Sequence, residues 1–330
     1  MKTASQRTEK LLSSAVIWDN HGCMPLRADA TFLPQLSRYR RAGFTVISLN
    51  IGFADMSWAE HVQILSFMRQ WIALHPDEYR LLRTIEDVRR CKAEGKLGIA
   101  FDVEGMNPVQ DELSFVQTFY ELGVRWMLVA YNRNNCAGGG CLDVDPGLTP
   151  VGRAVIDEME RVGMVLCLSH CGTRTAAEAL EYARNPPIFS HSNPAGDTPH
   201  ARNISDDLIR ACARKGGVVG LSGLGPMLGG DDKLVGRLVR QVRYMSDLVG
   251  PEHVGLGLDY VFDRAELEEY LRMKPDLLSL PQGSSGDLAM IEPEALDRLV
   301  DGLTQCHFTD TQIRGVLGEN WLRVATQVWR

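Results

Sequence analysis

Two short stretches, VLCLSH at residues 165–170 and PIFSH at residues 187–191, determine the fold that this sequence predicts. Each is an apolar run of strand length that ends in Ser-His, and residues 173–185 between them carry Ala and Leu at helical spacing before a Pro-Pro stop. The unit therefore predicts strand, helix, strand. Because a parallel unit of this kind brings both strand ends to one edge of the sheet, we expect His170 and His191 to lie close together.

The same alternation of apolar runs and amphipathic stretches extends over the rest of the 330 residues. Further strands are predicted at 15–18, 44–49, 97–103, 126–130, 217–221 and 254–258, helices at 35–42, 57–74, 84–95, 111–122, 149–162, 205–215, 232–248, 293–303, 309–317 and 319–328, and a surface loop at 274–287. Such repeats without a linker predict a single α/β domain over residues 1–330, a (β/α)8 TIM barrel with extra C-terminal helices. An open doubly wound sheet is the alternative, but no GxGxxG or P-loop motif accompanies it.

The charge and composition of the chain exclude some classes of partner. A net charge of -7 and a pI near 5.7 argue against nucleic acid or an anionic membrane as the main partner. No apolar run approaches the roughly 18 residues of a membrane span, and the N-terminal segment is polar, so we expect a cytoplasmic protein. The eight cysteines have neither the density of a disulfide framework nor the spacing of a zinc ribbon, which predicts reduced thiols.

Polar side chains with metal-binding chemistry follow the predicted strands. In a barrel, function lies at the carboxyl ends of the strands, and the residues found there are Asp19, His21, Glu104, Tyr131, Asn132, His170, His191 and Asp259. Imidazole with carboxylate suits zinc, iron or manganese, and a bridging Glu104 would allow two metals. Taken singly, a histidine at a strand end is more often structural, and a salt bridge is the ordinary role for Glu104. The set together favours a metal site.

Five motifs in this pattern resemble the membrane (renal) dipeptidase family, the M19-type metallopeptidases, and especially its bacterial members. They are LSHC at 168–171, IFSHSN at 188–193, HARN at 200–203, VGLGLD at 254–259 and GENW at 318–321. The resemblance runs from about Val16 to the end of the chain and implies a (β/α)8 barrel, in agreement with the strand count. It also implies a zinc-dependent hydrolase that cleaves dipeptides, often with a D-residue at the carboxyl side, and it is compatible with a homodimer.

The resemblance implies a ligand set for two zinc ions. His170 and His191 correspond to the ligands of one zinc, Glu104 to the bridging carboxylate, and His21 to the first member of the His-x-Asp pair that binds the other zinc. Cys23 stands in place of the aspartate of that pair. As a thiolate it could bind zinc, because sulfur is a good zinc ligand, or it could be a non-ligand that leaves the first site weak or empty. One zinc is therefore the alternative to two.

Three further residues are implied to act on the substrate. Arg202 corresponds to the arginine that receives the substrate carboxylate, which suits its bidentate fork, and Asp259 to the acid that manages the proton of the attacking water and of the leaving amine. Tyr131 replaces the histidine that steadies the oxyanion in many relatives, and it could donate its phenol hydrogen or merely pack against the substrate.

The expected activity is cleavage of dipeptides, or of related small carboxylate-bearing amides, through a metal-bound hydroxide. Two alternatives remain open. One is a one-metal amidohydrolase acting on N-acyl amino acids. The other is a catalytically retired relative that binds a small ligand. The second alternative is opposed by six retained residues, because loss of catalysis should release several of them: His21, Glu104, His170, His191, Arg202 and Asp259.

Overall fold

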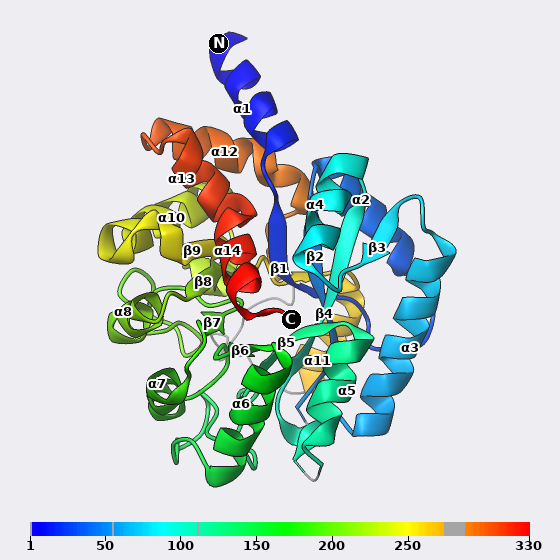
Figure 1. Ribbon diagram of the computed structural model, residues 1–330. Helices are drawn as coiled ribbons and strands as arrows, with labels where there is room; N and C mark the ends of the chain where they lie inside the picture. Colours follow the sequence, from blue (N-terminus) through cyan, green and yellow to red (C-terminus); the bar gives the residue numbers. More distant parts are fainter. Residues whose placement is uncertain (1, 55, 111, 274–287) are drawn as a thin grey trace.

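The protein is a closed barrel of parallel strands surrounded by helices (Figure 1). The computed structural model describes residues 2–54, 56–110, 112–273 and 288–330. The barrel strands are β1 (Trp18–Cys23), β2 (Val46–Phe53), β4 (Leu97–Glu104), β5 (Val124–Leu128), β6 (Val165–Cys167), β7 (Ile188–Phe189), β8 (Val218–Leu221) and β9 (Val254–Leu256). Asp19 of β1 pairs with Leu256 of β9, which closes the ring. The predicted (β/α)8 barrel is confirmed.

Two further short strands extend the sheet beyond the eight of the barrel. β3 (Tyr79–Leu81) runs parallel to β4 on its outer side, and β10 (Tyr260–Val261) continues from β9 alongside the end of β1. The sequence predicted neither strand, since residues 81 and 82 were expected to lie in a connector. Strands of two or three residues are too short to show the alternation by which a strand is recognised.

Helices cover the outside of the barrel. Those that follow barrel strands or connect them are α2 (Leu36–Ala42), α3 (Trp58–Leu74), α4 (Ile85–Glu94), α5 (Ser114–Leu122), α6 (Pro150–Val162), α7 (Thr173–Tyr182), α8 (Asp206–Arg214) and α10 (Leu234–Val249). Ser57 and Thr84, the first residues of two of the predicted helices, form capping boxes at the starts of α3 and α4. None of the helices in the described ranges is long and apolar enough to cross a membrane.

The remaining helices lie outside the repeating unit. They are α1 (Lys2–Ser14), α9 (Gly225–Leu228), α11 (Arg264–Met273), α12 (Leu296–Gln305), α13 (Asp310–Arg314) and α14 (Asn320–Val328). The sequence predicted the three C-terminal helices but not α1, α9 or α11. The loop predicted at 274–287 lies outside the described residues.

The position predicted for the first strand from the sequence is wrong. It was predicted at 15–18, whereas β1 spans Trp18–Cys23 and includes the polar residues Asp19, Asn20 and His21, all of them buried. These side chains are buried next to other polar groups, such as Tyr39 beside Asp19 and Ser48 beside Asn20, so an apolar pattern does not reveal the strand. His21 and Cys23 therefore lie within β1 rather than after it.

The GENW motif at 318–321 packs the C-terminal helix across the amino end of the barrel (Figure 1). The Asn320 side-chain amide donates to the carbonyl oxygens of Pro251 and Val254 at 2.8 and 2.7 Å. The Trp321 indole donates to the Leu256 carbonyl at 3.0 Å. A Cβ atom at Gly318 would lie 2.5 Å from the Val16 carbonyl oxygen, so only glycine allows this close approach. The motif is therefore structural.

Replacing Trp321 with alanine should destabilise the barrel from this end. Trp321 is 3% exposed, so its removal leaves a large cavity and an unpaired Leu256 carbonyl. We expect the free energy of unfolding to fall by about 3–5 kcal/mol for Trp321→Ala, and by less for Trp321→Phe. Chemical denaturation followed by circular dichroism measures both. Equal stability of wild type and Trp321→Ala would contradict the assigned role.

Candidate active site

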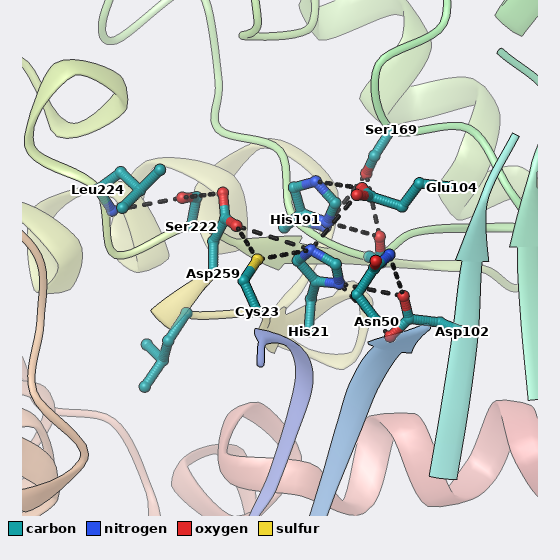
Figure 2. Close-up of polar contacts among 12 residues, drawn as sticks. His21, Cys23, Asn50, Asp102, Glu104, Ser169, His191, Ser222, Leu224 and Asp259 are labelled. Carbon is teal, nitrogen blue, oxygen red and sulfur yellow. Dashed lines mark hydrogen bonds and ion pairs between the residues drawn. The ribbon is translucent and has the colours of Figure 1, made fainter. Parts of the chain in front are cut away.

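Imidazoles from three other strands converge on the carboxylate of Glu104 at the end of β4. Figure 2 shows two of them, His21 and His191, beside Glu104. Its Oε1 atom lies 3.2 Å from His170 Nε2, 3.3 Å from His191 Nε2 and 3.7 Å from His21 Nε2. The Nε2 atoms of His170 and His191 are 2.7 Å apart. His170 follows β6 and His191 follows β7, so the proximity expected from the strand, helix, strand unit is found.

A second group of ligand-type atoms lies on the other side of His21 (Figure 2). The Cys23 Sγ atom is 3.5 Å from His21 Nε2 and 3.4 Å from Asp259 Oδ1, and His21 Nε2 is 3.6 Å from the same Asp259 oxygen. His21, Cys23 and Asp259 thus have the mutual distances of residues that can share one metal ion, as do His21, Glu104 and His191. Cys23 therefore belongs, with His21 and Asp259, to one of these two candidate metal-binding groups.

The second ring nitrogen of each imidazole lies near an oxygen. The pairs are His170 Nδ1 with Asn132 Oδ1 at 2.7 Å, His191 Nδ1 with Ser190 Oγ at 2.8 Å, and His21 Nδ1 with Asp102 Oδ2 at 3.4 Å. Contacts of this kind fix ring orientation and tautomer, and they are typical of metal-ligating histidines. All three Nε2 atoms are thereby directed toward the Glu104 side of the site.

Several residues that hold the site's side chains in place were not predicted from the sequence, or were given little weight. Asp102 lies two residues before Glu104, so the sequence allows it to be a supporting partner or a charge inside the barrel, and its contact with His21 Nδ1 favours the first role. Asn50 and Ser222 are less telling residues at strand ends in the sequence, yet the Asn50 amide donates to Asp102 Oδ1 at 3.0 Å and the Ser222 hydroxyl donates to Asp259 Oδ2 at 3.4 Å. No role was predicted for Asn132 or Ser190. Their positions at strand ends could have indicated one, because polar side chains at the carboxyl ends of barrel strands face one shared edge.

Three site residues have left-handed backbone conformations. The φ angles are 64° at His170, 59° at Asp259 and 56° at Asn132. Such values are uncommon for residues other than glycine and cost free energy that the surrounding structure must supply. The Asp259 amide donates to the His21 carbonyl at 3.0 Å, which anchors one of these turns to β1. The fold therefore holds the side chains in position through its backbone.

The electrostatics of the site fit a divalent cation. Burial raises the pKa of Glu104 to about 8, and its Oε1 atom is buried without a hydrogen-bond partner in the described chain. Burial, together with the charges of Arg202 and His21, lowers the pKa values of His170 and His191 well below the usual range. Neutral imidazoles around an unbonded carboxylate oxygen are the donor set that a zinc-like ion requires.

The Cys23 thiol is part of the same electrostatic setting. Burial raises its pKa to about 12, although the charge of His21 opposes this effect. The thiol is therefore protonated unless a cation is bound next to it, since a coordinated thiol loses its proton.

A cavity of about 210 Å³ opens above these groups, and Arg202 and Tyr131 contribute to its wall. Arg202 is 3% exposed, and its Nε and Nη2 atoms have no partner among the described residues. The Tyr131 ring stacks on His170 with centroids 4.2 Å apart. The rest of the wall is largely apolar: Met24, Pro25, Leu26, Phe53, Leu224, Met227, Val261, Leu267 and Leu288. Of the residues predicted to bind metal or substrate, all but His191 line this cavity, and His191 Nε2 lies 3.3 Å from Glu104 Oε1.

A (β/α)8 barrel with imidazole, carboxylate and thiol groups at the carboxyl ends of its strands is the architecture of metal-dependent hydrolases. The chain belongs to the membrane dipeptidase family (peptidase family M19), whose model matches residues 54–278. It is therefore a peptide-bond hydrolase of a metallopeptidase family. The matched region includes Glu104, His170, His191 and Asp259 but not the segment that carries Cys23.

The sequence relatives include bacterial and fungal proteins. An uncharacterized protein in the pqqA 5′ region of Klebsiella pneumoniae is 28% identical over 84% of this chain and 97% of its own length. An uncharacterized dipeptidase of Schizosaccharomyces pombe is 29% identical over 78% of this chain and 59% of its own length.

Solved structures resemble the whole barrel. A Pseudomonas aeruginosa amidohydrolase is 25% identical, with a TM-score of 0.88 over 98% of this chain and 99% of its own. A Rhodobacter sphaeroides metallopeptidase, solved with a phosphinate mimic of L-Ala-D-Ala, is 20% identical, with a TM-score of 0.78 over 96% of this chain and 99% of its own. At 20% identity, the likeness to the Rhodobacter sphaeroides structure supports the fold alone.

Metal content tests the position of Cys23. We expect two metal equivalents per chain for wild type and one for Cys23→Ser, because a hydroxyl is a much weaker zinc ligand than a thiolate. Elemental analysis of protein purified without added metal or chelator gives the numbers, and Cys306→Ser, which lies at the end of α12, is the matched control. The same content in wild type and Cys23→Ser would show that Cys23 is not a ligand.

Proposed function

We propose that this protein is a zinc-dependent dipeptidase with two metal positions. The observation that carries the proposal is the arrangement of three imidazole Nε2 atoms within 3.7 Å of one buried, unbonded carboxylate oxygen of Glu104. His170, His191 and Glu104 would hold one ion, and His21 and Cys23 the other, with Glu104 between them. Zinc suits this mixture of nitrogen, oxygen and sulfur donors.

The bound zinc would supply an activated water near neutral pH and would polarise the scissile carbonyl. The chain's own residues perform the remaining tasks. Asp259 lies 3.6 Å from His21 Nε2 and faces the cavity, so it is placed to accept the proton of the water and return it to the leaving amine. Tyr131 faces the same space, and its phenol is the candidate donor to the developing oxyanion.

The cavity also indicates the class of substrate. Two unpaired nitrogen atoms on the buried Arg202 guanidinium are suited to a carboxylate, which they would orient by two parallel hydrogen bonds. The apolar wall suits uncharged side chains of moderate size. Dipeptides with apolar residues, including those with a D-residue at the carboxyl side, are therefore the proposed substrates. The Rhodobacter sphaeroides metallopeptidase of the same fold was solved with a phosphinate mimic of a dipeptide of this kind, L-Ala-D-Ala.

One observation favours a second substrate class. Two of the acidic residues near the cavity, Asp263 and Glu266, form ion pairs with Arg27 at 3.1 and 3.3 Å, so they are already partnered. An acyl chain could occupy the apolar wall without an ammonium group. N-acyl amino acids, cleaved with one or two metals, are therefore the alternative substrates.

Arg202 should determine the preference for a free carboxylate. For Arg202→Met, we expect kcat/KM on a dipeptide such as L-Leu-D-Ala to fall about 100-fold, because a charge-assisted pair of hydrogen bonds is lost. The corresponding dipeptide amide should be a poor substrate for both proteins. Arg210→Met, an exposed arginine on α8, is the matched control. If the variant kept the wild-type preference for acid over amide, Arg202 would not be the carboxylate contact.

Asp259 should act mainly on the chemical step. We expect Asp259→Asn to lower kcat by about 10²–10⁴-fold, the range for loss of a general acid and base. Asp263→Asn, which changes a carboxylate of the same cavity that is paired with Arg27, is the control and should stay near wild type. Steady-state kinetics with metal content measured in parallel separates proton transfer from metal loss. Wild-type turnover by Asp259→Asn would refute the assignment.

A further inference from the structure

A second, smaller cavity lies at the opposite end of the barrel from the active site. Its volume is about 20 Å³, and it is enclosed between the start of the barrel interior and the C-terminal helix α14. Trp18 and Asn20 of β1, Arg125 and Trp126 of β5, and Trp329 beyond α14 contribute to its wall. Figure 1 shows α14 and the end of the chain over the centre of the ring of strands. The space can hold one or two small species.

Four of the side chains that line this cavity each carry a nitrogen donor that lacks an acceptor. Trp18 Nε1, Trp126 Nε1, Asn20 Nδ2 and Arg125 Nε are all buried, and each has no hydrogen-bond partner within the described part of the chain. Leaving a buried N–H group unpaired costs roughly 1–3 kcal/mol. Because such groups are rare in native proteins, four around one small cavity indicate that they share an acceptor which the chain itself does not provide.

The guanidinium of Arg125 adds a positive charge to these donors. Arg125 is 3% exposed and donates to the carbonyl oxygens of Tyr120, Val124 and Arg83 at 2.7, 2.9 and 3.0 Å. It stacks over the rings of Tyr120 and Trp329, with 4.3 and 5.3 Å to the centroids. All these partners are neutral.

No acidic side chain in the described ranges forms an ion pair with Arg125. Burial lowers the pKa of Arg125 to about 10, so it stays cationic at neutral pH. Buried charges in proteins are normally compensated by an opposite charge.

Water satisfies this cavity poorly. Each water accepts about two hydrogen bonds and brings two hydrogens that need acceptors of their own. The side chains of the wall offer few acceptors, because Asn20 Oδ1 already accepts from Ser48 Oγ at 3.1 Å and several other lining residues, such as Val165, Ile188 and Val324, are apolar. A monatomic anion accepts from several donors at once, donates none, and compensates the guanidinium charge.

We propose that this cavity is a binding site for a small monatomic anion. Chloride is the most abundant anion of this kind in solution. The anion accepts hydrogen bonds from the indoles of Trp18 and Trp126, the Asn20 amide and the Arg125 guanidinium. It joins β1 and β5 to the C-terminal segment, because Trp329 packs on Trp18 with ring centroids 5.7 Å apart and lies over Arg125. The site is structural, and it is independent of the metals and substrate of the catalytic end.

Thermal stability in different salts tests the proposal on the whole protein. At constant ionic strength, replacing sodium gluconate by sodium chloride up to 500 mM should raise the Tm of wild type by about 2–5 °C, since only the folded state binds the anion. Trp18→Phe retains an aromatic ring but removes one donor, and Arg125→Met removes the charge. Both should reduce the chloride-dependent shift by at least half, measured relative to each variant's own Tm in gluconate.

A matched control distinguishes the cavity from a general salt effect. Trp71→Phe changes a buried tryptophan of α3 that does not line the cavity, so it should keep the full chloride shift. If Arg125→Met does not fold, Trp18→Phe against Trp71→Phe decides the question. Absence of a chloride shift in wild type, or an equal shift in Trp18→Phe and Trp71→Phe, would overturn the proposal.

Bromide gives a direct view of the site. In crystals grown with sodium bromide in place of chloride, an anomalous peak should lie within about 3.2–3.6 Å of the indole nitrogens of Trp18 and Trp126, the range of N–H to halide contacts, which are longer than N–H to oxygen contacts. Trp18→Phe crystals should show a weaker peak. A site filled by ordinary water, with no anomalous signal in wild type, would refute the anion assignment.

Discussion

The carboxylate of Asp19 joins the first and last strands of the barrel, and the active site depends on that closure. Its Oδ1 atom accepts the Leu258 amide at 2.7 Å, and its Oδ2 atom accepts the Tyr39 hydroxyl at 2.9 Å. Asp259 follows Leu258 directly, and His21 lies two residues beyond Asp19. The interaction that closes the barrel therefore also brings His21 and Asp259 to 3.6 Å.

The two ends of the barrel interior have opposite chemistry. At the carboxyl ends of the strands, carboxylate, imidazole and thiol groups face one another and require a cation. At the amino ends, the unpaired N–H groups belong to indole, amide and guanidinium side chains that line the lower cavity, and they favour an anion. Trp126 contributes to both ends, since its ring packs against His21 with centroids 5.6 Å apart and the residue also lines the lower cavity. Buried polar groups are tolerated at either end only when a partner compensates them.

Cys23 is the main departure from the ligand pattern that the family resemblance implies. The structure places its sulfur 3.5 Å from His21 Nε2, so the departure changes the ligand atom and leaves the location of the site unchanged. A thiolate is softer than a carboxylate and binds zinc at a longer distance. In the proposed two-metal site, the change would therefore affect the strength and selectivity of one metal position, while His170, His191 and Glu104 would supply the nitrogen and oxygen donors of the other.

The sequence by itself determined the alternation of strands and helices, the caps at Ser57 and Thr84, and the residues at the strand ends, because these follow from local periodicity and capping. Only the tertiary structure decided where β1 lies and which partners hold the imidazoles. Asn132 and His170 are 38 positions apart, yet their side chains meet at 2.7 Å. Such contacts depend on the register between strands and on barrel closure, which no local pattern encodes.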